Sequence, residues 1–447
     1  MSDSVVLVDF GASRVKAVHW SLKHGRCISS RECAAPILRR GAQGEAEGDP
    51  ESYWEALEAT AGQFVSADAN VQDMWLCSEM HGFLLVSPSG VVPLTPYISW
   101  QDQRACGVRR GESMLMDLLQ ESLAPVLMLE SGLRLRPGLP IVNLAANKAQ
   151  FADLGPARLM TLVDWLLVRG GEVAPRCHPS MAAGTGFYSL ITGYWSDKLM
   201  RLAGVDPHAL SMPVLQSDPG APLGKVRLGG RVVNLWGGVG DLQAAAHGAG
   251  LPHVSSVFIN LGTGSQVLAA TTQAAKNVEV RQCVGGEFLH AITHIPSGRA
   301  LNTYAAFIDQ CACDGGGGKL FWRRFSELKA EDVLSADPSI DLNVFGAAWR
   351  YSGGGSVSHV NEGKFSLGWF MHSLARSWLT QYAEALQSFA VQPPGLTFIV
   401  GGGLSRRASF TSPVLEALLG RKVVQVNLRT GEETLDGLLT LAESAQQ

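Results

Sequence analysis

Two aspartates in this 447-residue chain occupy positions where a carboxylate can do chemistry. Asp9 interrupts the apolar run of residues 5–10, and a carboxylate inside an apolar strand is costly unless an ion or a strong partner accompanies it. Asp241 follows a glycine-rich turn predicted at residues 237–240 and precedes a predicted helix that starts near Leu242. Asp9 could hold a magnesium ion, whereas Asp241 could cap the helix, act as a rigidly held base, or do both.

Three glycine-containing turns could accommodate phosphate groups. Missing side chains let a ligand approach backbone N–H groups, although a tight turn without a ligand would look the same. Two turns join predicted hairpin strands, and the third follows a predicted buried strand; they are Gly11-Ala12-Ser13, Gly262-Thr263-Gly264 and Gly401-Gly402-Gly403. Together with the two aspartates, these turns supply the parts that phosphoryl transfer needs.

The first two turns belong to similar segments. Asp9-Phe10-Gly11-Ala12-Ser13 aligns with Asn260-Leu261-Gly262-Thr263-Gly264. Each has a carboxylate or amide, an apolar residue, a glycine and two small residues. A repeat this far apart predicts a duplicated lobe, although generic hairpin chemistry would also produce so short a match.

Alternating short strands and helices must position these residues, which indicates an α/β fold. We expect strands at residues 5–10, 15–20, 74–77, 83–86, 232–236, 257–261, 266–270 and 396–400. We expect helices at residues 53–64, 110–130, 157–169 and 432–443, and another that starts after Ser405. Residues 218–230 look like a connector. We divide the chain into an N-terminal domain, residues 1–240, and a C-terminal domain, residues 241–447.

Composition narrows the function classes. A net charge of −4 gives no basic footprint for nucleic acid and no polybasic patch for a membrane surface. No run of ~18 apolar residues predicts a membrane-spanning helix. The eight cysteines are scattered, which is typical of free thiols, and no charged-then-apolar leader opens the sequence. We expect a cytoplasmic enzyme with a small-molecule substrate, and we leave open a homodimer.

Taken together, the motifs resemble those of the FGGY family of carbohydrate kinases, along the whole chain and in the family's order. The segments that carry the resemblance are Asp9-Phe10-Gly11-Ala12-Ser13-Arg14-Val15-Lys16, Glu79-Met80-His81-Gly82, Trp100-Gln101-Asp102-Gln103-Arg104, Gly240-Asp241-Leu242-Gln243, residues 260–267 and Gly401-Gly402-Gly403. The resemblance implies a duplicated two-lobe actin-like or hexokinase-like (ribonuclease H-like) ATPase fold, with a cleft between the lobes.

The resemblance also implies roles for individual residues. Asp241 would be the general base and touch the sugar, and Asp9 would hold Mg2+ through water. The ATP phosphates and adenosine would be bound by Gly11, Ser13, Lys16, Gly262, Thr263, Gly264, Gly401, Gly402 and Gly403. The sugar pocket would be lined by Met80, His81, Trp100 and Asp102. A core tryptophan and an ordinary buried histidine are the alternative interpretations of Trp100 and His81.

Within the family, the segment with Leu242 and Gln243 after Asp241 is similar to that of sedoheptulokinases. A sedoheptulokinase-like enzyme is therefore our first expectation, and a xylulokinase-like enzyme is the alternative. The chain departs from the family at Ala12, which is usually Thr, and at Glu79, which is usually Gln. Two other function classes stay open: a sugar-binding regulator without transfer activity, and an actin-like ATPase that acts as a chaperone or scaffold. The sequence identifies neither the ketose nor the hydroxyl.

Overall fold

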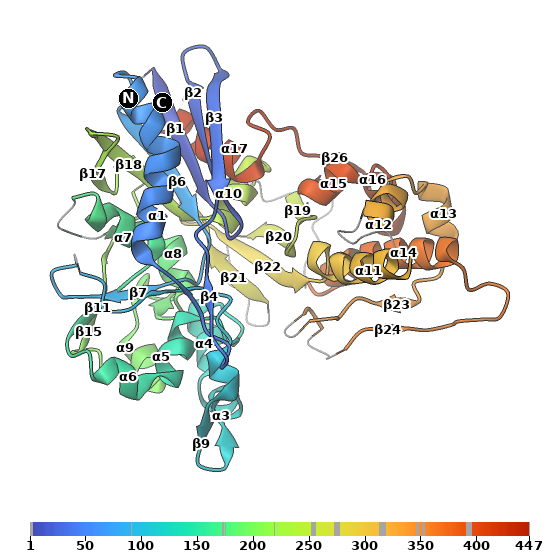
Figure 1. Cartoon of the computed structure of the whole chain (residues 1–447), viewed down its shortest axis with the longest axis horizontal. Coiled ribbons are helices and arrows are strands. Elements are labelled where there is room, and N and C mark those ends of the chain that lie inside the picture. The colour runs from blue at the N-terminus through green and yellow to red at the C-terminus, as the bar shows by residue number, and fades with distance from the viewer. Residues whose placement is uncertain are drawn as a thin grey trace. The chain divides into compact units, whose positions relative to one another are not determined.

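The computed structural model describes residues 3–90, 92–171, 174, 176–218, 220–251, 256–271, 278–312, 319–345, 348–350, 354–389 and 396–446. The chain forms two compact units (Figure 1). The first comprises residues 1–250, 273–288 and 428–447, and the second comprises residues 251–272 and 289–427. Residues 240 and 241, where we expected the two domains to meet, both lie in the first unit, so Asp9 and Asp241 belong to one folded body.

The central sheet of the first unit has the strand order β17-β18-β6-β1-β2-β3. Its strands are β1 (Ser4–Phe10), β2 (Arg14–Ser21), β3 (Arg26–Ala34), β6 (Asp73–Ser78), β17 (Gly224–Leu228) and β18 (Arg231–Gly240). β1 and β18 run parallel to β6, and β2 is antiparallel to β1. The carboxyl ends of β1, β6 and β18 therefore meet at one edge of the sheet, where ligands bind in many α/β folds.

Helices cover both faces of this sheet, which explains why β1 is buried along its whole length and reads as a continuous apolar run. On one face lie α10 (Asp241–Gly248) and α17 (Glu433–Ser444). On the other lie α1 (Pro50–Leu57), the π-helical segment η1 (Glu58–Gly62), α2 (Gln63–Ala67) and α7 (Leu162–Arg169) (Figure 1).

Two glycines allow α10 and α17 to pack closely. A Cβ atom on Gly437 would lie 1.9 Å from the carbonyl oxygen of Ala244, and one on Gly248 would lie 2.0 Å from that of Glu433. Neither contact is sterically allowed, so only glycine fits at these positions. The approach seats the helix that begins with Asp241 firmly on the sheet.

The remaining elements of the first unit are short. The strands are β4 (Arg39–Arg40), β5 (Ala46–Gly48), β7 (Leu84–Val86), β8 (Tyr97–Ile98), β9 (Arg109–Arg110), β10 (Ser113–Met114), β11 (Ala157–Met160), β12 (Arg176–Cys177), β13 (Tyr188–Ser189), β14 (Tyr194–Trp195), β15 (Leu210–Ser211), β16 (Val214–Leu215) and β21 (Glu279–Gln282). The helices are η2 (Arg104–Gly107), α3 (Leu115–Ser122), α4 (Ala124–Ser131), α5 (Pro140–Ala146), α6 (Lys148–Ala152), α8 (Pro179–Gly184) and α9 (Asp197–Leu202).

The sheet of the second unit repeats the topology of the first. Five of its six strands lie in this unit, in the order β22-β20-β19-β25-β26, and they are β22 (Phe288–Ile295), β20 (Ser265–Thr271), β19 (Ser256–Asn260), β25 (Thr397–Gly401) and β26 (Val423–Gln425). β19 pairs antiparallel with β20 and parallel with β25, as β1 pairs with β2 and β6. The repeat seen in the two glycine turns thus extends to whole sheets.

Helices and a two-stranded ribbon complete the second unit. They are α11 (Gly298–Cys311), α12 (Lys319–Ser326), α13 (Ala330–Ser335), α14 (Leu367–Gln387), α15 (Gly403–Arg407) and α16 (Thr411–Leu419), with β23 (Ile340–Asp341) and β24 (Ser356–Val357). Aromatic rings tie these helices together, since Phe325 lies 5.8 Å from Trp378 and 5.4 Å from Phe410 between ring centroids.

Several predicted elements were wrong in part. Residues 110–130 begin with the exposed β9–β10 hairpin, which turns at Gly111 with φ +62°, before α3 and α4. Residues 157–160 form β11, because they pair with β7 and β15, and the helix α7 starts only at Leu162. The predicted connector 218–230 contains β17, which pairs with β18.

The glycines before Asp241 do not form a turn. Gly237 and Gly238 have φ values of +77° and +63° and form a bulge inside β18, where the register with β6 shifts. β18 therefore continues to Gly240, which is the N-cap of α10 in place of Asp241. In the second unit, α15 already starts at Gly403 rather than after Ser405.

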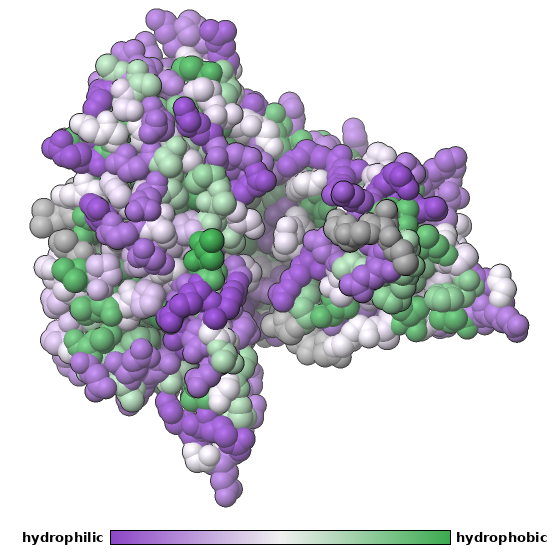
Figure 2. Space-filling view, viewed as in Figure 1, coloured by the Kyte–Doolittle hydropathy of each residue, from purple (hydrophilic) through white to green (hydrophobic). Residues whose placement is uncertain are grey.

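Hydrophilic residues predominate on the face drawn in Figure 2, with hydrophobic residues in small groups between them. Large exposed apolar side chains include Ile37, Ile191 and Tyr194. Within the described ranges, none of the helices has the length and apolar character needed to cross a membrane.

Candidate active site

Asp9 is the next-to-last residue of β1, at the edge where the three parallel strands finish, and it is 9% exposed. Its Oδ2 accepts a 2.8 Å hydrogen bond from the hydroxyl of Thr434, in the first turn of α17. The thiol of Cys77, its register partner on β6, donates to Oδ1 at 3.7 Å. Burial raises the pKa of Asp9, although Thr434 and the charge of Lys16 oppose the rise.

The turn after Asp9 is held by a hydrogen bond of 3.1 Å from the N–H of Gly11 to the carbonyl of Arg14. Ser13 is exposed on this turn. Lys16 lies opposite Asp9 on β2, and its Nζ forms a 2.7 Å ion pair with Glu432, just before α17. The predicted phosphate hairpin and the carboxylate therefore form one cluster.

Asp241 begins α10 directly after β18, and it is half-buried. Its Oδ1 accepts a 2.8 Å hydrogen bond from the N–H of Leu242. Burial and then the negative charge of Asp9 raise the pKa of Asp241 to about 7, and the bond from Leu242 opposes the rise. A carboxylate with that pKa can accept a proton near neutral pH, as a general base must.

Glu79 follows β6 at the same edge and is 7% exposed. Its Oε1 accepts a hydrogen bond of 2.9 Å from the hydroxyl of Tyr97, and its Oε2 accepts one of 3.0 Å from Nε1 of Trp100. Burial raises the pKa of Glu79 to about 7. The next residue, Met80, is buried, and its thioether packs against Gly240 so closely that a Cβ there would lie 2.7 Å from Sδ.

His81 has a φ of 67°, in the left-handed region that is uncommon for residues other than glycine and is often seen at functional sites. Its Nδ1 lies 2.6 Å from the carbonyl oxygen of Gly184, so Nδ1 carries the proton and donates. Its Nε2 faces Nη2 of Arg136 at 3.5 Å. Burial and the charges of Arg136 and Arg281 hold the pKa of His81 well below its usual range, so the ring is neutral.

Arg136 belongs to an ionic cluster that the sequence did not reveal. Oε1 of Glu279 accepts from Nη1 of Arg136, from Nη2 of Arg281 and from the backbone N–H of Arg134, each at 3.1 Å. Glu279 and Arg281 lie on β21, more than 140 residues along the chain from Arg136. The Arg-x-Arg spacing in residues 134–136 was the only signal, and it does not name a partner.

Asp102 differs from the other predicted sugar residues. It is 0% exposed, and its Oδ2 accepts from the backbone N–H of Ala46 at 2.9 Å and from Nη2 of Arg104 at 2.6 Å. Arg104 also reaches Glu47 at 2.6 Å. The carboxylate is therefore used inside the protein and presents no surface to a ligand.

In the second unit, the turn of Gly262, Thr263 and Gly264 is braced from behind. The N–H groups of Gly298 and Arg299, at the start of α11, donate to the carbonyls of Gly262 and Thr263, both at 3.1 Å. A Cβ on Gly298 would lie 3.0 Å from Cα of Thr263, so this brace requires a glycine. Thr263 and Gly264 themselves are exposed.

The third glycine segment lies beside this turn. Asn260 pairs with Gly401 in the parallel register, and the N–H of Leu261 donates to the carbonyl of Gly401 at 2.8 Å. Gly402 has a φ of +90°, and a Cβ there would lie 2.4 Å from the carbonyl oxygen of Leu261. The structure thus brings together all six predicted nucleotide residues of this unit, on adjacent strand ends.

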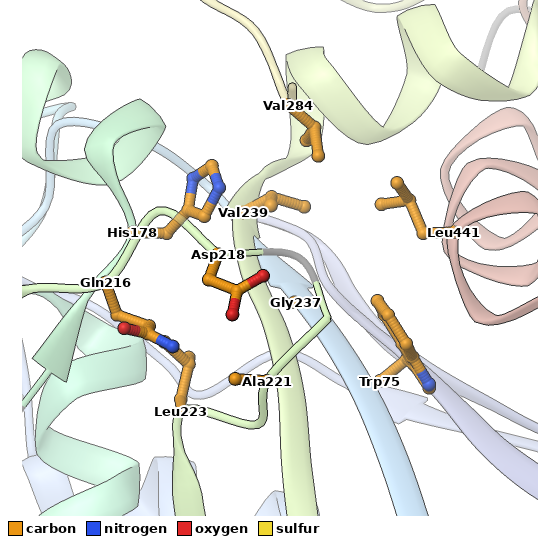
Figure 3. Close-up of a pocket in the computed structure, with 10 residues that line it drawn as sticks. All are labelled: Trp75, His178, Gln216, Asp218, Ala221, Leu223, Gly237, Val239, Val284 and Leu441. Carbon is orange, nitrogen blue, oxygen red and sulfur yellow. The ribbon is translucent and has the colours of Figure 1, made fainter. Parts of the chain in front are cut away.

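A small cavity of about 20 Å³ lies beside β18 in the first unit. Figure 3 shows His178, Gln216 and Asp218 on one side of the strand and Trp75, Val284 and Leu441 on the other. The cavity has room for about one water molecule, so it is too small for a sugar. Its His178 bonds the hydroxyl of Ser180 at 2.8 Å, and that hydroxyl accepts from the N–H of Gly240 at 3.3 Å. This pair supports the backbone just before Asp241.

Among the described residues, no three His, Cys, Asp or Glu side chains are placed to hold a metal ion by themselves. Asp9 and Asp241 nevertheless offer two carboxylates at one sheet edge. Mg2+ is commonly bound by one or two carboxylates together with substrate phosphates and water. The residues present therefore fit a magnesium ion that arrives with a nucleotide.

Residues 4–227, half of the chain, match the N-terminal domain of the FGGY family of carbohydrate kinases. The apulose kinase of Pectobacterium atrosepticum is 25% identical over 321 residues, which are 66% of this chain and 62% of that kinase. A glycerol kinase of Acinetobacter baylyi is 30% identical over 190 residues, which are 40% of this chain and 36% of that kinase. The chain therefore matches less than two thirds of the length of these relatives.

Solved structures resemble the whole chain. A xylulose kinase from Lactobacillus acidophilus has a TM-score of 0.81 at 16% identity and covers 99% of this chain and 89% of its own. The glycerol kinase of Plasmodium falciparum with ADP has a TM-score of 0.79 at 12% identity and covers 100% and 90%. At such identities the likeness shows the fold alone, and it confirms the predicted duplicated actin-like fold.

Proposed function

Because the chain belongs to the FGGY family of carbohydrate kinases, we propose that it transfers the γ-phosphoryl group of ATP to a hydroxyl of a small ketose. One observation carries the proposal: Asp241, with a pKa of about 7, lies at the sheet edge where β1, which carries Asp9, also ends. A base and a metal-binding carboxylate are the two charged parts that this transfer needs from the protein.

In the proposed reaction, a sugar hydroxyl oxygen bonds to the γ-phosphorus of ATP while the bond from that phosphorus to the bridging oxygen breaks. ADP leaves, and the hydroxyl proton passes to the carboxylate of Asp241. The backbone N–H of Leu242 and the N-terminal end of α10 hold this carboxylate in place. Asp9 would hold Mg2+, which neutralises phosphate charge when bound.

We assign the nucleotide to the glycine segments. Backbone N–H groups of Gly262, Thr263 and Gly264 would bind phosphate oxygens, and α11 would hold the turn in place through the carbonyls of Gly262 and Thr263. Gly401, Gly402 and Gly403 would lie against adenosine. On the first unit, the exposed Ser13 with Gly11 and Lys16 would contact phosphate, and Lys16 would exchange its partner Glu432 for the nucleotide.

We assign the sugar to Met80, His81 and Trp100. The neutral His81 is fixed by Gly184 and Arg136, and the half-buried Trp100 offers a ring for the C–H face of a sugar. We no longer assign Asp102 to direct contact with the sugar, because Arg104 and the backbone N–H of Ala46 occupy its carboxylate. We propose that Asp102 instead holds the segment that carries Trp100.

Sedoheptulose is our first candidate substrate, and D-xylulose is the alternative. Leu242 cannot hydrogen-bond to the reactive end of a sugar, and Gln243 is 0% exposed with its amide N–H bound to the carbonyl of Gln282 at 3.0 Å. An assay of ATP consumption with sedoheptulose, D-xylulose, apulose and glycerol, followed by isolation of the phosphorylated product, tests both the reaction and the order of substrates.

The same assay separates the two other function classes. A sugar-binding regulator would bind a ketose, for example by calorimetry, without consuming ATP. An actin-like ATPase would consume ATP at a rate that no sugar changes. Sugar-dependent ADP release with a phosphorylated sugar as product supports the kinase, and its absence with every sugar tested contradicts it.

A further inference from the structure

We infer that Glu79 is a positioning residue that fixes the orientation of the Trp100 indole ring. The effect on a sugar rests on the proposed function, whereas the anchoring itself is a property of the folded chain. Glu79 lies at the end of β6, and its backbone N–H donates to the carbonyl of Phe10 at 2.9 Å. Its side chain then reaches Nε1 of Trp100 at 3.0 Å.

The direction of this hydrogen bond is fixed by chemistry. An indole N–H can only donate, so Oε2 of Glu79 must accept from Trp100. Oε1 meets the hydroxyl of Tyr97, which can donate or accept. The site therefore requires an acceptor on the side of Trp100, and it tolerates either an acceptor or a donor on the side of Tyr97.

The acceptor is itself held rigidly. The Tyr97 hydroxyl lies where a Cβ on Gly82 would be only 1.7 Å away, so residue 82 must be glycine to admit it. The Tyr97 ring packs edge-on against Tyr53 with centroids 4.8 Å apart. Glu79, which is 7% exposed, thus has little freedom to follow a moving Trp100.

Trp100 is also fixed at its backbone. A Cβ on Gly138 would lie 1.8 Å from the Trp100 carbonyl oxygen, which shows how closely the two backbones approach. The backbone packing at Gly138 and the hydrogen bond from the indole N–H to Glu79 together hold the ring at two points. A ring held in this way presents the same face to every ligand, and so avoids losing conformational freedom on binding.

Glu79 departs from the family in charge but keeps the ability to accept a hydrogen bond from Trp100. Glutamine, the usual residue in the family, also offers a carbonyl oxygen to the indole N–H and an amide to Tyr97. Both residues supply the acceptor that Trp100 requires. The chain keeps the hydrogen bond while changing the charge, so Glu79→Gln is the conservative variant and Glu79→Leu the one that removes the acceptor.

The test labels the full chain with 15N-tryptophan and follows the indole N–H signals by NMR. The signal that disappears in Trp100→Phe identifies Trp100. We expect Glu79→Leu to move that signal and Glu79→Gln to leave it near its original position. The matched control is Asp73→Leu, because Oδ1 of Asp73 accepts from Nε1 of Trp236 at 2.7 Å; it should move the Trp236 signal and not that of Trp100.

Kinetics supply the second readout. We expect the KM for the best sugar to rise about tenfold in Glu79→Leu, with a smaller change in kcat, and to rise clearly less in Glu79→Gln. In the Trp100→Phe background, Glu79→Leu should raise the KM little further, because the indole N–H that donates to Glu79 is already absent. Should Glu79→Leu fail to fold, two separate single variants still test the bond. Trp100→Phe breaks it by removing the donor, and Glu79→Gln preserves it by keeping an acceptor.

An unmoved Trp100 signal in Glu79→Leu overturns the inference, whatever the enzyme phosphorylates. Equal KM values for Glu79→Leu and Glu79→Gln, with a moved signal, overturn the positioning of the sugar by this ring. A moved signal in a chain that phosphorylates no sugar at all supports the anchoring and contradicts the proposed function instead.

Discussion

The hydroxyl of Thr434 donates a 2.8 Å hydrogen bond to Oδ2 of Asp9, across 425 residues of sequence. The bond links the first strand of the chain to its last helix, and it orients the carboxylate that we assign to Mg2+. Lys16 and Glu432 make a second link at the same place. The segment that contains Glu432 and Thr434 therefore contacts β1 at Asp9, the proposed metal ligand, and β2 at the neighbouring Lys16.

Thr434→Val tests this link, because it removes the hydroxyl and keeps the shape of the side chain. We expect the Mg2+ concentration that gives half-maximal activity to rise about threefold to tenfold, since Asp9 loses a hydrogen bond to a buried carboxylate. Titration of MgCl2 at saturating ATP measures it. Thr440→Val is the matched control on α17, because the Thr440 hydroxyl donates to the carbonyl of Asp436 within the helix. An equal shift in both variants would remove the assignment.

Asp241→Asn should lose ~10²–10⁴-fold in kcat, the usual effect of removing a general base. The amide keeps the shape of the carboxylate and cannot accept the hydroxyl proton. Binding of ADP, measured by calorimetry, should stay within a few-fold of wild type. Turnover within a few-fold of wild type would show that Asp241 is not the base.

The pH dependence of kcat/KM should rise from pH 5.5 to 8 with an apparent pKa near 7, because the base must be ionised and the pKa of Asp241 is about 7. Part of that pKa comes from the negative charge of Asp9. Asp9→Asn should therefore shift the acid limb of the residual activity to lower pH. A limb that stays in place would mean that another group, such as Glu79, controls it.

Candidate site residues were predictable where their chemistry coincides with a local sequence pattern. Asp9 within an apolar run, and Asp241 before an alanine-rich helix, were both recognisable and lie at one sheet edge. Thr434 was not, because a hydrogen bond across the whole chain leaves no local pattern. Asp102 shows another limit: a motif specifies spacing, but whether a side chain faces a ligand or its own neighbour Arg104 depends on packing.

The glycines also include some whose structural role was predictable from the sequence and some whose role was not. The repeat of glycine turns predicted two related sheets, because each turn sits at the end of a buried strand. Gly237 and Gly238 were interpreted as a turn, yet they form a bulge inside β18. Positive φ values occur in both turns and bulges, so the residue type alone could not distinguish them.

Ionisation of Asp241 should also be visible in stability. The folded-state pKa of about 7 lies above the ordinary value of 3.8, so between these values the folded state binds more protons than the unfolded state. Stability contributed by the protonated form is then lost as pH rises through this window. Asp241→Asn has no carboxylate to ionise and so does not lose this stability. We expect the Tm of the variant minus the Tm of wild type to be larger at pH 8 than at pH 5. A Tm difference that does not vary with pH would contradict the raised pKa.

Gly402→Ala should destabilise the chain and weaken nucleotide binding. The backbone of Gly402 has φ 90° and ψ 157°, a region that only glycine adopts readily, and other residues there cost roughly 1–3 kcal/mol. The added Cβ would also lie 2.4 Å from the carbonyl oxygen of Leu261 and 2.6 Å from Oδ1 of Asn260, so β25 must move away from β19. Gly403→Ala is the matched control for stability, because a Cβ there meets nothing within 4 Å and its φ is ordinary. Urea unfolding of both variants measures the difference in stability, and titration of Gly402→Ala and wild type with ADP measures the effect on the nucleotide. If Gly402→Ala were as stable as Gly403→Ala and bound ADP as tightly as wild type, the close approach of the two strands would have no part in holding the nucleotide.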